Sequence, residues 1–143
     1  MIPFAELVAT TNFSFLRGGS HPEELVATAA RLGLAGLAVA DRNTLAGVVR
    51  GHVMARENGL ADGGFRYAVG CRLAFRDGTP DIVAWPTDRA AYGRLCRLLT
   101  LGNRRAPKGE CHLDRADLLA GGDSLNLGVV PPREGAAAAT SSG

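Results

Sequence analysis

The residues best placed to do chemistry stand directly after predicted strands of this 143-residue chain. They form four short polar clusters: Thr10-Thr11-Asn12, Asp41-Arg42-Asn43, Cys71-Arg72 and Pro86-Thr87-Asp88. In parallel α/β proteins such positions meet at the carboxyl edge of the sheet, where metal ligands and catalytic side chains lie. Asp41 is the candidate in these clusters to bind a hard cation or to act as a base.

The surroundings of Asp41 argue against a metal site. Zinc takes about four ligands and magnesium about six, so the carboxylate of Asp41 by itself is not enough. Arg42 and Arg72 lie in the same clusters, and a guanidinium repels a divalent cation because it has no lone pair to donate. We therefore predict no catalytic residue and no metal ligand here, and an ion pair between Asp41 and one of these arginines. A helix cap or a remnant metal site at Asp41 remains an alternative.

Other catalytic patterns are absent from the sequence. It has neither G-x-x-x-x-G-K-[ST] nor G-x-G-x-x-G for phosphates, although the arginines could clamp a phosphate group. Ser14 and Ser20 lack the G-x-S-x-G elbow of a serine nucleophile. The cysteines form no C-x-x-C pair, which is typical of idle thiols in a reducing cytosol. Structural or surface roles are predicted for His21, His52, His112, Cys71, Cys96 and Cys111.

A basic patch lies in the second half of the chain. It contains five cations and no acidic residue: Arg94, Arg97, Arg104, Arg105 and Lys108. The patch ends in a predicted loop, "LGNRRAPKGECHL". The net charge of the chain is only +2, so binding to nucleic acid would depend on such a local patch. This loop could contact nucleic-acid phosphates, dock on an acidic partner or be solvated, and the sequence favours none of the three.

The elements that must position these residues alternate between strands and helices. Apolar runs predict strands that begin near residue 6 and cover 34–41, 66–75, 81–86 and 125–130. A first helix is predicted after a capping box at Ser20–Glu23 with Pro22 in its first turn. Further helices are predicted over 43–58, after a cap at Thr87, and from Asp114. Gly33 and Gly59 should end the first two helices.

This order of elements predicts an α/β fold. Strands that alternate with helices favour parallel pairing through right-handed crossovers. The third and fourth strands are separated only by "RDGTP", so they could instead form a hairpin through Asp77-Gly78. The inner face of the helix after Thr87 should carry Ala91, Leu95, Leu98 and Leu99.

The composition is that of one globular domain, with 46% hydrophobic and 21% charged residues. No basic start followed by an apolar run marks a signal peptide, and no stretch approaches the ~20 apolar residues of a membrane span. A soluble cytoplasmic protein without a membrane partner is therefore predicted. The run "REGAAAATSSG" predicts a low-complexity tail or linker over 133–143, which leaves a domain over 1–132.

Two long stretches carry a resemblance to a known family. Residues 10–59, which begin "TTNFSFLRGGSHPEELVATAARLGLAGLAVADRN", and residues 85–113, "WPTDRAAYGRLCRLLTLGNRRAPKGECHL", resemble the N-terminal polymerase-and-histidinol-phosphatase (PHP) domain of bacterial C-family DNA polymerases. The second stretch favours the error-prone branch over the replicative one. The resemblance implies a distorted, TIM-like (βα)7 barrel, of which this chain would form roughly half, with metal ligands at the carboxyl ends of the strands.

The resemblance also implies which positions would hold the metal. A His-x-His pair falls on Val8 and Thr10, where neither residue is a ligand. An Asp-His pair falls on Asp41 and Arg42, of which only Asp41 matches, and a glutamate position holds Arg72. Metal-dependent phosphoesterase or proofreading chemistry is therefore not expected.

The function that the resemblance implies is a structural and interaction role within a longer enzyme. The parent polymerase would synthesise DNA with Mg²⁺ during damage tolerance, in translesion replication, and its polymerase active site would lie outside this segment. The expected partners are the remainder of the polymerase chain, DNA through that polymerase, and accessory damage-tolerance proteins. The alternatives are a stand-alone PHP-type metal-dependent phosphoesterase and a non-functional truncated fragment, which we expect to be marginally stable alone.

Overall fold

The computed structural model describes residues 4–14 and 19–131, and it shows a mixed α/β fold with one five-stranded sheet. The elements, in chain order, are β1 (Ala5–Ala9), α1 (Pro22–Arg31), β2 (Gly36–Arg42), α2 (Val48–Glu57), the 3₁₀ helix η1 (Leu60–Gly63), β3 (Arg66–Leu73), β4 (Ile82–Pro86), α3 (Arg89–Arg105), α4 (Arg115–Gly121) and β5 (Leu125–Val129). In the described ranges, no helix is long and apolar enough to cross a membrane. The predicted tail over 133–143 lies outside these ranges.

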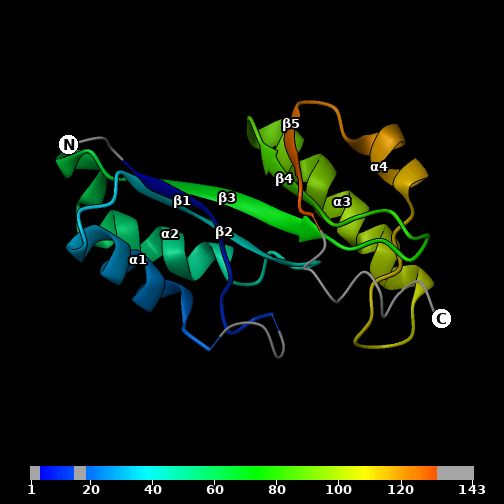
Figure 1. The fold of residues 1–143 in the computed structure, drawn as a ribbon, viewed down its shortest axis with the longest axis horizontal. Helices are drawn as coiled ribbons and strands as arrows, with labels where there is room; N and C mark the ends of the chain where they lie inside the picture. Colours follow the sequence, from blue (N-terminus) through cyan, green and yellow to red (C-terminus); the bar gives the residue numbers. More distant parts are fainter. Residues whose placement is uncertain (1–3, 15–18, 132–143) are drawn as a thin grey trace.

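The sheet is parallel in its first part and antiparallel in its second, in the order β1-β2-β3-β4-β5. β1 pairs with β2 and β2 with β3 in parallel, and a helix makes each connection. β4 pairs antiparallel with β3 and with β5, so the predicted hairpin is confirmed. Gly78 takes φ +85° in its turn, a conformation that favours glycine. The sheet curls into half a barrel, with α1 and α2 beside β1 to β3, and α3 and α4 beside β4 and β5 (Figure 1).

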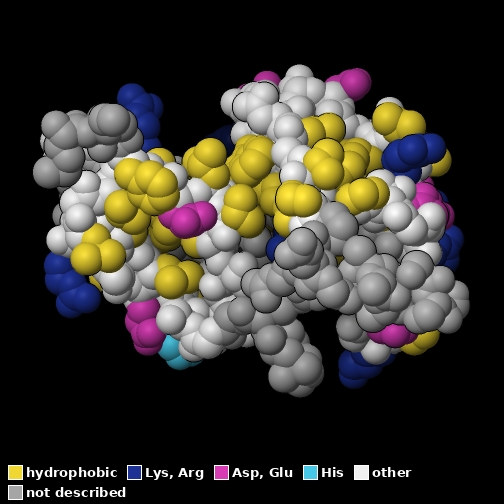
Figure 2. Space-filling view, in the orientation of Figure 1, with side chains coloured by type: hydrophobic (Ala, Val, Ile, Leu, Met, Phe, Trp, Pro, Cys, Tyr) yellow, Lys and Arg dark blue, Asp and Glu magenta, His cyan; other side chains and the backbone are white. Residues whose placement is uncertain are grey.

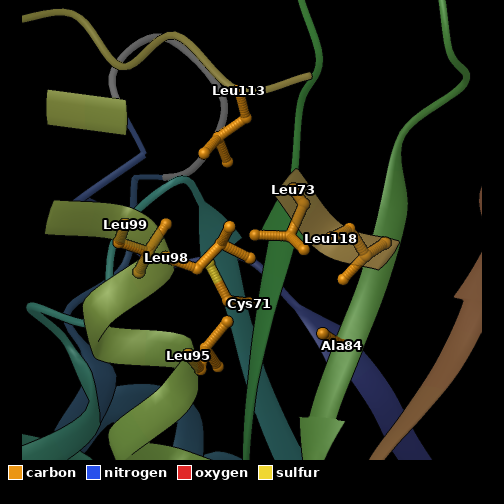
Figure 3. Packing of buried hydrophobic residues seen from close by; sticks show 8 residues of the cluster. All are labelled: Cys71, Leu73, Ala84, Leu95, Leu98, Leu99, Leu113 and Leu118. Carbon is orange, nitrogen blue, oxygen red and sulfur yellow. The ribbon is translucent and has the colours of Figure 1, made fainter. Parts of the chain in front are cut away.

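Two hydrophobic clusters hold the helices against the sheet. The first packs Val26 and Ala29 of α1 against Leu37 and Val39 of β2. The second, shown in Figure 3, joins β3 and β4 to α3, α4 and the segment between them through Cys71, Leu73, Ala84, Leu95, Leu98, Leu99, Leu113 and Leu118. Each fully buried leucine contributes about 1.5–3 kcal/mol to stability. The buried face predicted for α3 is therefore confirmed.

The start of α1 differs in part from the prediction. The helix begins at Pro22, whose missing N–H has no helical acceptor to lose at this position. The capping box predicted at Ser20–Glu23 is wrong, because the N-cap is His21 and no side chain caps the helix there. Gly33 takes φ +77° just beyond the helix, as its type indicates.

The starts of α2 and α3 are also shifted along the chain. α2 begins at Val48, not near residue 43, because Asn43 takes φ +53° and its side chain accepts the Ala74 N–H at 2.9 Å. This bond ties the end of β2 to the segment after β3. The predicted Thr87 cap of α3 is wrong, because the N-cap is Asp88. The Asp88 carboxylate accepts a first-turn N–H at 2.7 Å.

Trp85 bridges the sheet on the face opposite the helices. Its indole N–H donates to the carbonyl oxygen of Leu7 at 3.0 Å, although β2 and β3 lie between β1 and β4. Glycines on both neighbouring strands make room for the ring, because a Cβ would lie 2.8 Å from it at Gly70 and 3.1 Å at Gly128. The register of β1 shifts between Glu6 and Ala9, the stretch that contains Leu7. The bond joins β1 directly to β4 and so stabilises the curl of the sheet.

Candidate functional site

Asp41 ends the buried run of β2 and lies beneath the loop that follows β1. The residue is only 1% exposed. Its Oδ1 accepts the Thr11 N–H and the Ser14 hydroxyl, each at 2.7 Å, and its Oδ2 accepts the Thr11 hydroxyl at 2.6 Å. A buried polar side chain costs free energy unless it has hydrogen-bond partners, and these three bonds supply partners to both oxygens of Asp41. We call Thr11, Ser14 and Asp41 the Asp41 network.

The two hydroxyls connect this network to the surrounding backbone. Ser14 Oγ accepts the backbone N–H of Arg42 at 2.9 Å, and Thr11 Oγ1 accepts that of Phe13 at 3.1 Å. Gly47 packs closely against the network. A Cβ at this position would lie only 3.0 Å from Asp41 Oδ2, so a larger residue would crowd the carboxylate. The loop after β1 and the end of β2 are therefore held together as one unit.

The predicted ion pair between Asp41 and an arginine is wrong. Arg42 follows Asp41 along β2, so its side chain leaves the opposite face of the strand and is exposed. Arg72 donates instead to Asp81 across the β3–β4 hairpin, at 2.7 Å. Asp41 does not cap a helix either, since the N-cap of α2 is Gly47. Sequence reasoning missed the hydroxyl partners, whose only signal is a Thr-x-x-Ser spacing after β1.

The residues at this end of the sheet do not fit a metal ion. The five positions that the resemblance assigns to ligands hold Val8, Thr10, Asp41, Arg42 and Arg72. Asp41 alone offers carboxylate oxygens, and both of them accept hydrogen bonds in the Asp41 network. Within 4–14 and 19–131, no group of three or more His, Cys, Asp or Glu side chains could hold a metal. That no metal binds here stays a prediction, which this donor set supports.

Among the residues that the structure describes, Cys71 and the histidines form no arrangement for nucleophilic catalysis. Cys71 is fully buried in the second hydrophobic cluster, and burial raises the pKa of its thiol to about 12. The thiol is therefore uncharged at neutral pH and a poor nucleophile. The His21 ring lies 3.0 Å from the Asn12 side-chain nitrogen, and His112 lies 3.9 Å from a glutamate carboxylate. The structural and surface roles of the histidines stay predictions, which these two contacts support.

The end of the basic patch is partly helical, although the sequence predicts a loop from Leu101 onward. α3 extends to Arg105 and contains four of the five cations, while Lys108 lies beyond its end. Arg105 forms a two-pronged ion pair with Asp117 at 2.6 and 2.9 Å, and Arg94 donates to the Asp123 carbonyl oxygen at 2.9 and 3.1 Å. The cations without an ion pair or hydrogen bond to a described residue are Arg97, Arg104 and Lys108. The patch therefore offers a smaller positive surface than its composition indicates.

Comparison with known proteins shows what this chain resembles. The sequence model of the PHP domain matches residues 6–127. An error-prone DNA polymerase of Brucella abortus biovar 1 (strain 9-941) is 56% identical over 135 residues, which are 94% of this chain and 12% of that protein. An error-prone DNA polymerase of Rhodopseudomonas palustris (strain HaA2) is 60% identical over 117 residues, or 82% of this chain and 10% of that protein. The chain thus spans a small part of the length of these relatives.

Two solved structures share the fold. One is a protein of Bifidobacterium adolescentis assigned as a metal-dependent phosphoesterase, with a TM-score of 0.56 and 23% identity over 71% of this chain and 34% of that one. The other is an amidohydrolase of Chromobacterium violaceum with bound sulfate and no metal, with a TM-score of 0.55 and 24% identity over 70% of this chain and 33% of that one. These likenesses confirm the predicted TIM-like half-barrel.

Proposed function

Because the chain belongs to the PHP domain family, we propose that it is part of an error-prone DNA polymerase and acts there as a structural and interaction domain. Sequence identity above 50% to such polymerases, over most of this chain, supports the first part of the proposal. The second part depends on the chemistry of the strand ends.

The Asp41 network is the observation that carries the structural role. A ligand carboxylate must direct lone pairs at the metal, whereas both oxygens of Asp41 accept donors from the loop after β1. Arg42 and Arg72 occupy two further positions that the family uses for ligands, and a guanidinium has no lone pair to donate to a cation. The residues at the carboxyl end of the sheet therefore stabilise the fold and do not activate water.

The activity of the whole enzyme would then reside outside this segment. We propose that the parent protein performs DNA-directed DNA synthesis with Mg²⁺ during damage tolerance, in the cytoplasm. This segment would contact the remainder of the polymerase, and through it DNA and accessory damage-tolerance proteins. The DNA sequence around the reading frame tests this part of the proposal, because polymerase coding sequence must follow in the same or another frame. Its absence would contradict the proposal.

Metal binding by the purified chain tests the structural role. The chain is stripped with a chelator and dialysed against Zn²⁺ or Mn²⁺, and bound metal and hydrolysis of p-nitrophenyl phosphate are measured. We expect neither stoichiometric metal nor hydrolysis. A variant that restores the ligand types of the family, with Val8→His, Thr10→His, Arg42→His and Arg72→Glu, is the matched control for the metal assay. Stoichiometric metal on the unchanged chain would favour a stand-alone phosphoesterase.

A further inference from the structure

Within the described residues, one edge of β3 has no strand beside it over more than half of its length. The strand runs from Arg66 to Leu73, but β4 pairs only with residues 71–73. Beyond that point β4 leads away from β3 and continues its pairing with β5 (Figure 1). Residues 66–70 are therefore paired with β2 on one side and open on the other.

The directions of the hydrogen bonds show which backbone groups face this opening. The N–H of Arg66 and the C=O of Arg72 both bond to the β2 side, so the even-numbered residues of β3 point their backbone groups that way. Because these directions alternate along a strand, the N–H and C=O groups of Tyr67 and Val69 point into the opening. Among the described residues, no strand pairs with these four groups.

The opening is a groove of about 870 Å³, lined mostly by apolar side chains. On the helix face of β3, its walls are Val48 of α2 and Tyr92 of α3. On the opposite face, it is lined by Leu7 and Trp85. Figure 2 shows hydrophobic side chains gathered across the middle of this view of the molecule. The residues named here, with Tyr67 and Val69, define the β3-edge groove.

The wall formed by α2 is fixed in place before any ligand binds. The Tyr67 hydroxyl donates to the carbonyl oxygen of Val48 at 2.8 Å. The tyrosine fits against the helix because Gly51 has no side chain, and a Cβ there would lie 2.5 Å from the hydroxyl oxygen. The β3-edge groove is therefore preformed, which lowers the entropic cost of binding.

We propose that the β3-edge groove binds an extended segment of a partner protein, which adds a strand against Tyr67 and Val69. Side chains of a strand alternate between its two faces, so one would enter between Val48 and Tyr92 and the next would lie over Leu7 and Trp85. An extended backbone would also satisfy the four open N–H and C=O groups of β3 through ladder hydrogen bonds. This proposal does not rest on the polymerase assignment.

The charge at the rim indicates the chemistry of the bound segment. Arg89, at the start of α3, lines the groove and forms no ion pair with a described residue. The neighbouring Asp88 carboxylate already accepts the first-turn N–H of α3. A segment with apolar residues at alternate positions and an acidic residue next to them would satisfy both the groove and Arg89.

Amide hydrogen exchange on the 143-residue chain tests whether the edge is open. The amides of Ala68 and Gly70 donate to β2, whereas those of Tyr67 and Val69 face the groove. We expect the amides of Tyr67 and Val69 to exchange at least about tenfold faster than those of Ala68 and Gly70. Equal protection of all four amides would show that the edge is already covered, and would overturn the proposal.

Selection from a display library of random ten-residue peptides tests the ligand. Individual synthetic peptides from the enriched pool serve as the probes, and their affinities are measured on the soluble chain. We expect apolar residues at alternate positions with Asp or Glu beside them, and slower exchange of the Tyr67 and Val69 amides on binding. Methylation of the peptide nitrogens that face β3 should weaken binding at least about tenfold, because ladder hydrogen bonds are lost.

A pair of variants separates the strand edge from the side chains. Val69→Pro removes a donor that faces the groove and keeps the ladder to β2, as proline is tolerated on an open strand edge. It should weaken peptide binding about tenfold or more, whereas Val69→Thr, the matched control, should not. Thermal unfolding of both variants checks that they fold, and the methylated peptides need no variant at all.

Three results would overturn the proposal. The first is the absence of any enriched peptide, and the second is binding that neither Val69→Pro nor peptide methylation weakens. The third is self-association of the chain that protects the Tyr67 and Val69 amides, since the occupant would then be a second copy of this chain.

Discussion

The two halves of the molecule place their carboxylates in different environments. The half formed by β1, β2, β3, α1 and α2 buries Asp41 and satisfies it with hydroxyl and backbone donors. The half formed by β4, β5, α3 and α4 keeps Asp114 and Asp117 in partly exposed ion pairs with Arg76 and Arg105, and fills its interior with leucines. Salt screens the second arrangement but hardly affects the first. The first half thus uses a buried carboxylate as a structural contact, whereas the second uses carboxylates at its surface.

Replacement of Asp41 by alanine should show the largest effect. Three buried donors would lose their acceptor, so the free energy of unfolding should fall by about 4 kcal/mol in chemical denaturation. Asp81→Ala is the control from the hairpin, where the carboxylate is 25% exposed, and should cost less than about 1 kcal/mol. Equal losses in the two variants would remove the distinction between buried and exposed carboxylates.

Truncation of a leucine should have the next largest effect, in the second half. Leu95 is fully buried against β3 and β4, so Leu95→Ala should reduce the free energy of unfolding by about 3 kcal/mol through lost burial and a new cavity. Leu119 of α4 is 76% exposed, and Leu119→Ala should change the free energy of unfolding by less than about 0.5 kcal/mol. A small effect at Leu95 would show that the second half is not held by its leucines.

The link between the halves should contribute less than either interior. Trp85→Phe removes the indole donor to the Leu7 carbonyl and leaves an aromatic ring in place, so we expect a loss of about 1 kcal/mol in the free energy of unfolding. Tyr92→Phe is the comparison, because it removes a hydroxyl from an aromatic ring that takes no part in the Trp85–Leu7 bond. This variant should leave the free energy of unfolding nearly unchanged. A loss as large as that of Leu95→Ala would mean that the two halves unfold only as one unit.

The surface ion pairs should give the smallest effect. The hydrogen bond from Arg105 holds the pKa of Asp117 below its ordinary value of 3.8. Because the pKa of Asp117 is lower in the folded state, the ion pair stabilises the fold at pH values above the pKa of Asp117 in the unfolded chain. This contribution is lost as the pH falls through the folded-state pKa. The difference in thermal midpoint between the chain and Arg105→Gln should therefore be present at neutral pH. It should vanish in strong acid and in ~1 M salt, and persistence in either would contradict this account.

The sequence predicted the elements that depend on local patterns. The apolar run over 34–41 and the helical spacing of Leu95, Leu98 and Leu99 are periodic over short distances, and the structure confirms the strand and the buried helix face. Helix starts were less predictable. The hydrogen bond from the Ala74 N–H to the Asn43 side chain joins residues 31 positions apart, and α2 begins later in the chain because of it. Local capping signals carry no information about such a contact.

The candidate site was predictable in its position but not in its bonding. Asp41 was correctly expected at the end of β2, yet Thr11 lies 30 residues and Ser14 27 residues before it in the sequence. Arginine was the wrong partner because strand alternation sends the side chain of Arg42 to the other face. The open edge of β3 was also beyond prediction, since it depends on how far β4 pairs and not on which residues β3 contains.

Trp85 is the single tryptophan of the chain, and this gives the domain an optical signal of its own. Indole fluorescence responds to solvent and to nearby hydrogen-bond partners, so one emission spectrum reports whether β1 and β4 are joined across the sheet. Stopped-flow measurements could therefore time the closure of the half-barrel without an added label. The same ring lines the β3-edge groove, and a shift of its emission to shorter wavelength would signal that a bound strand has displaced water from it.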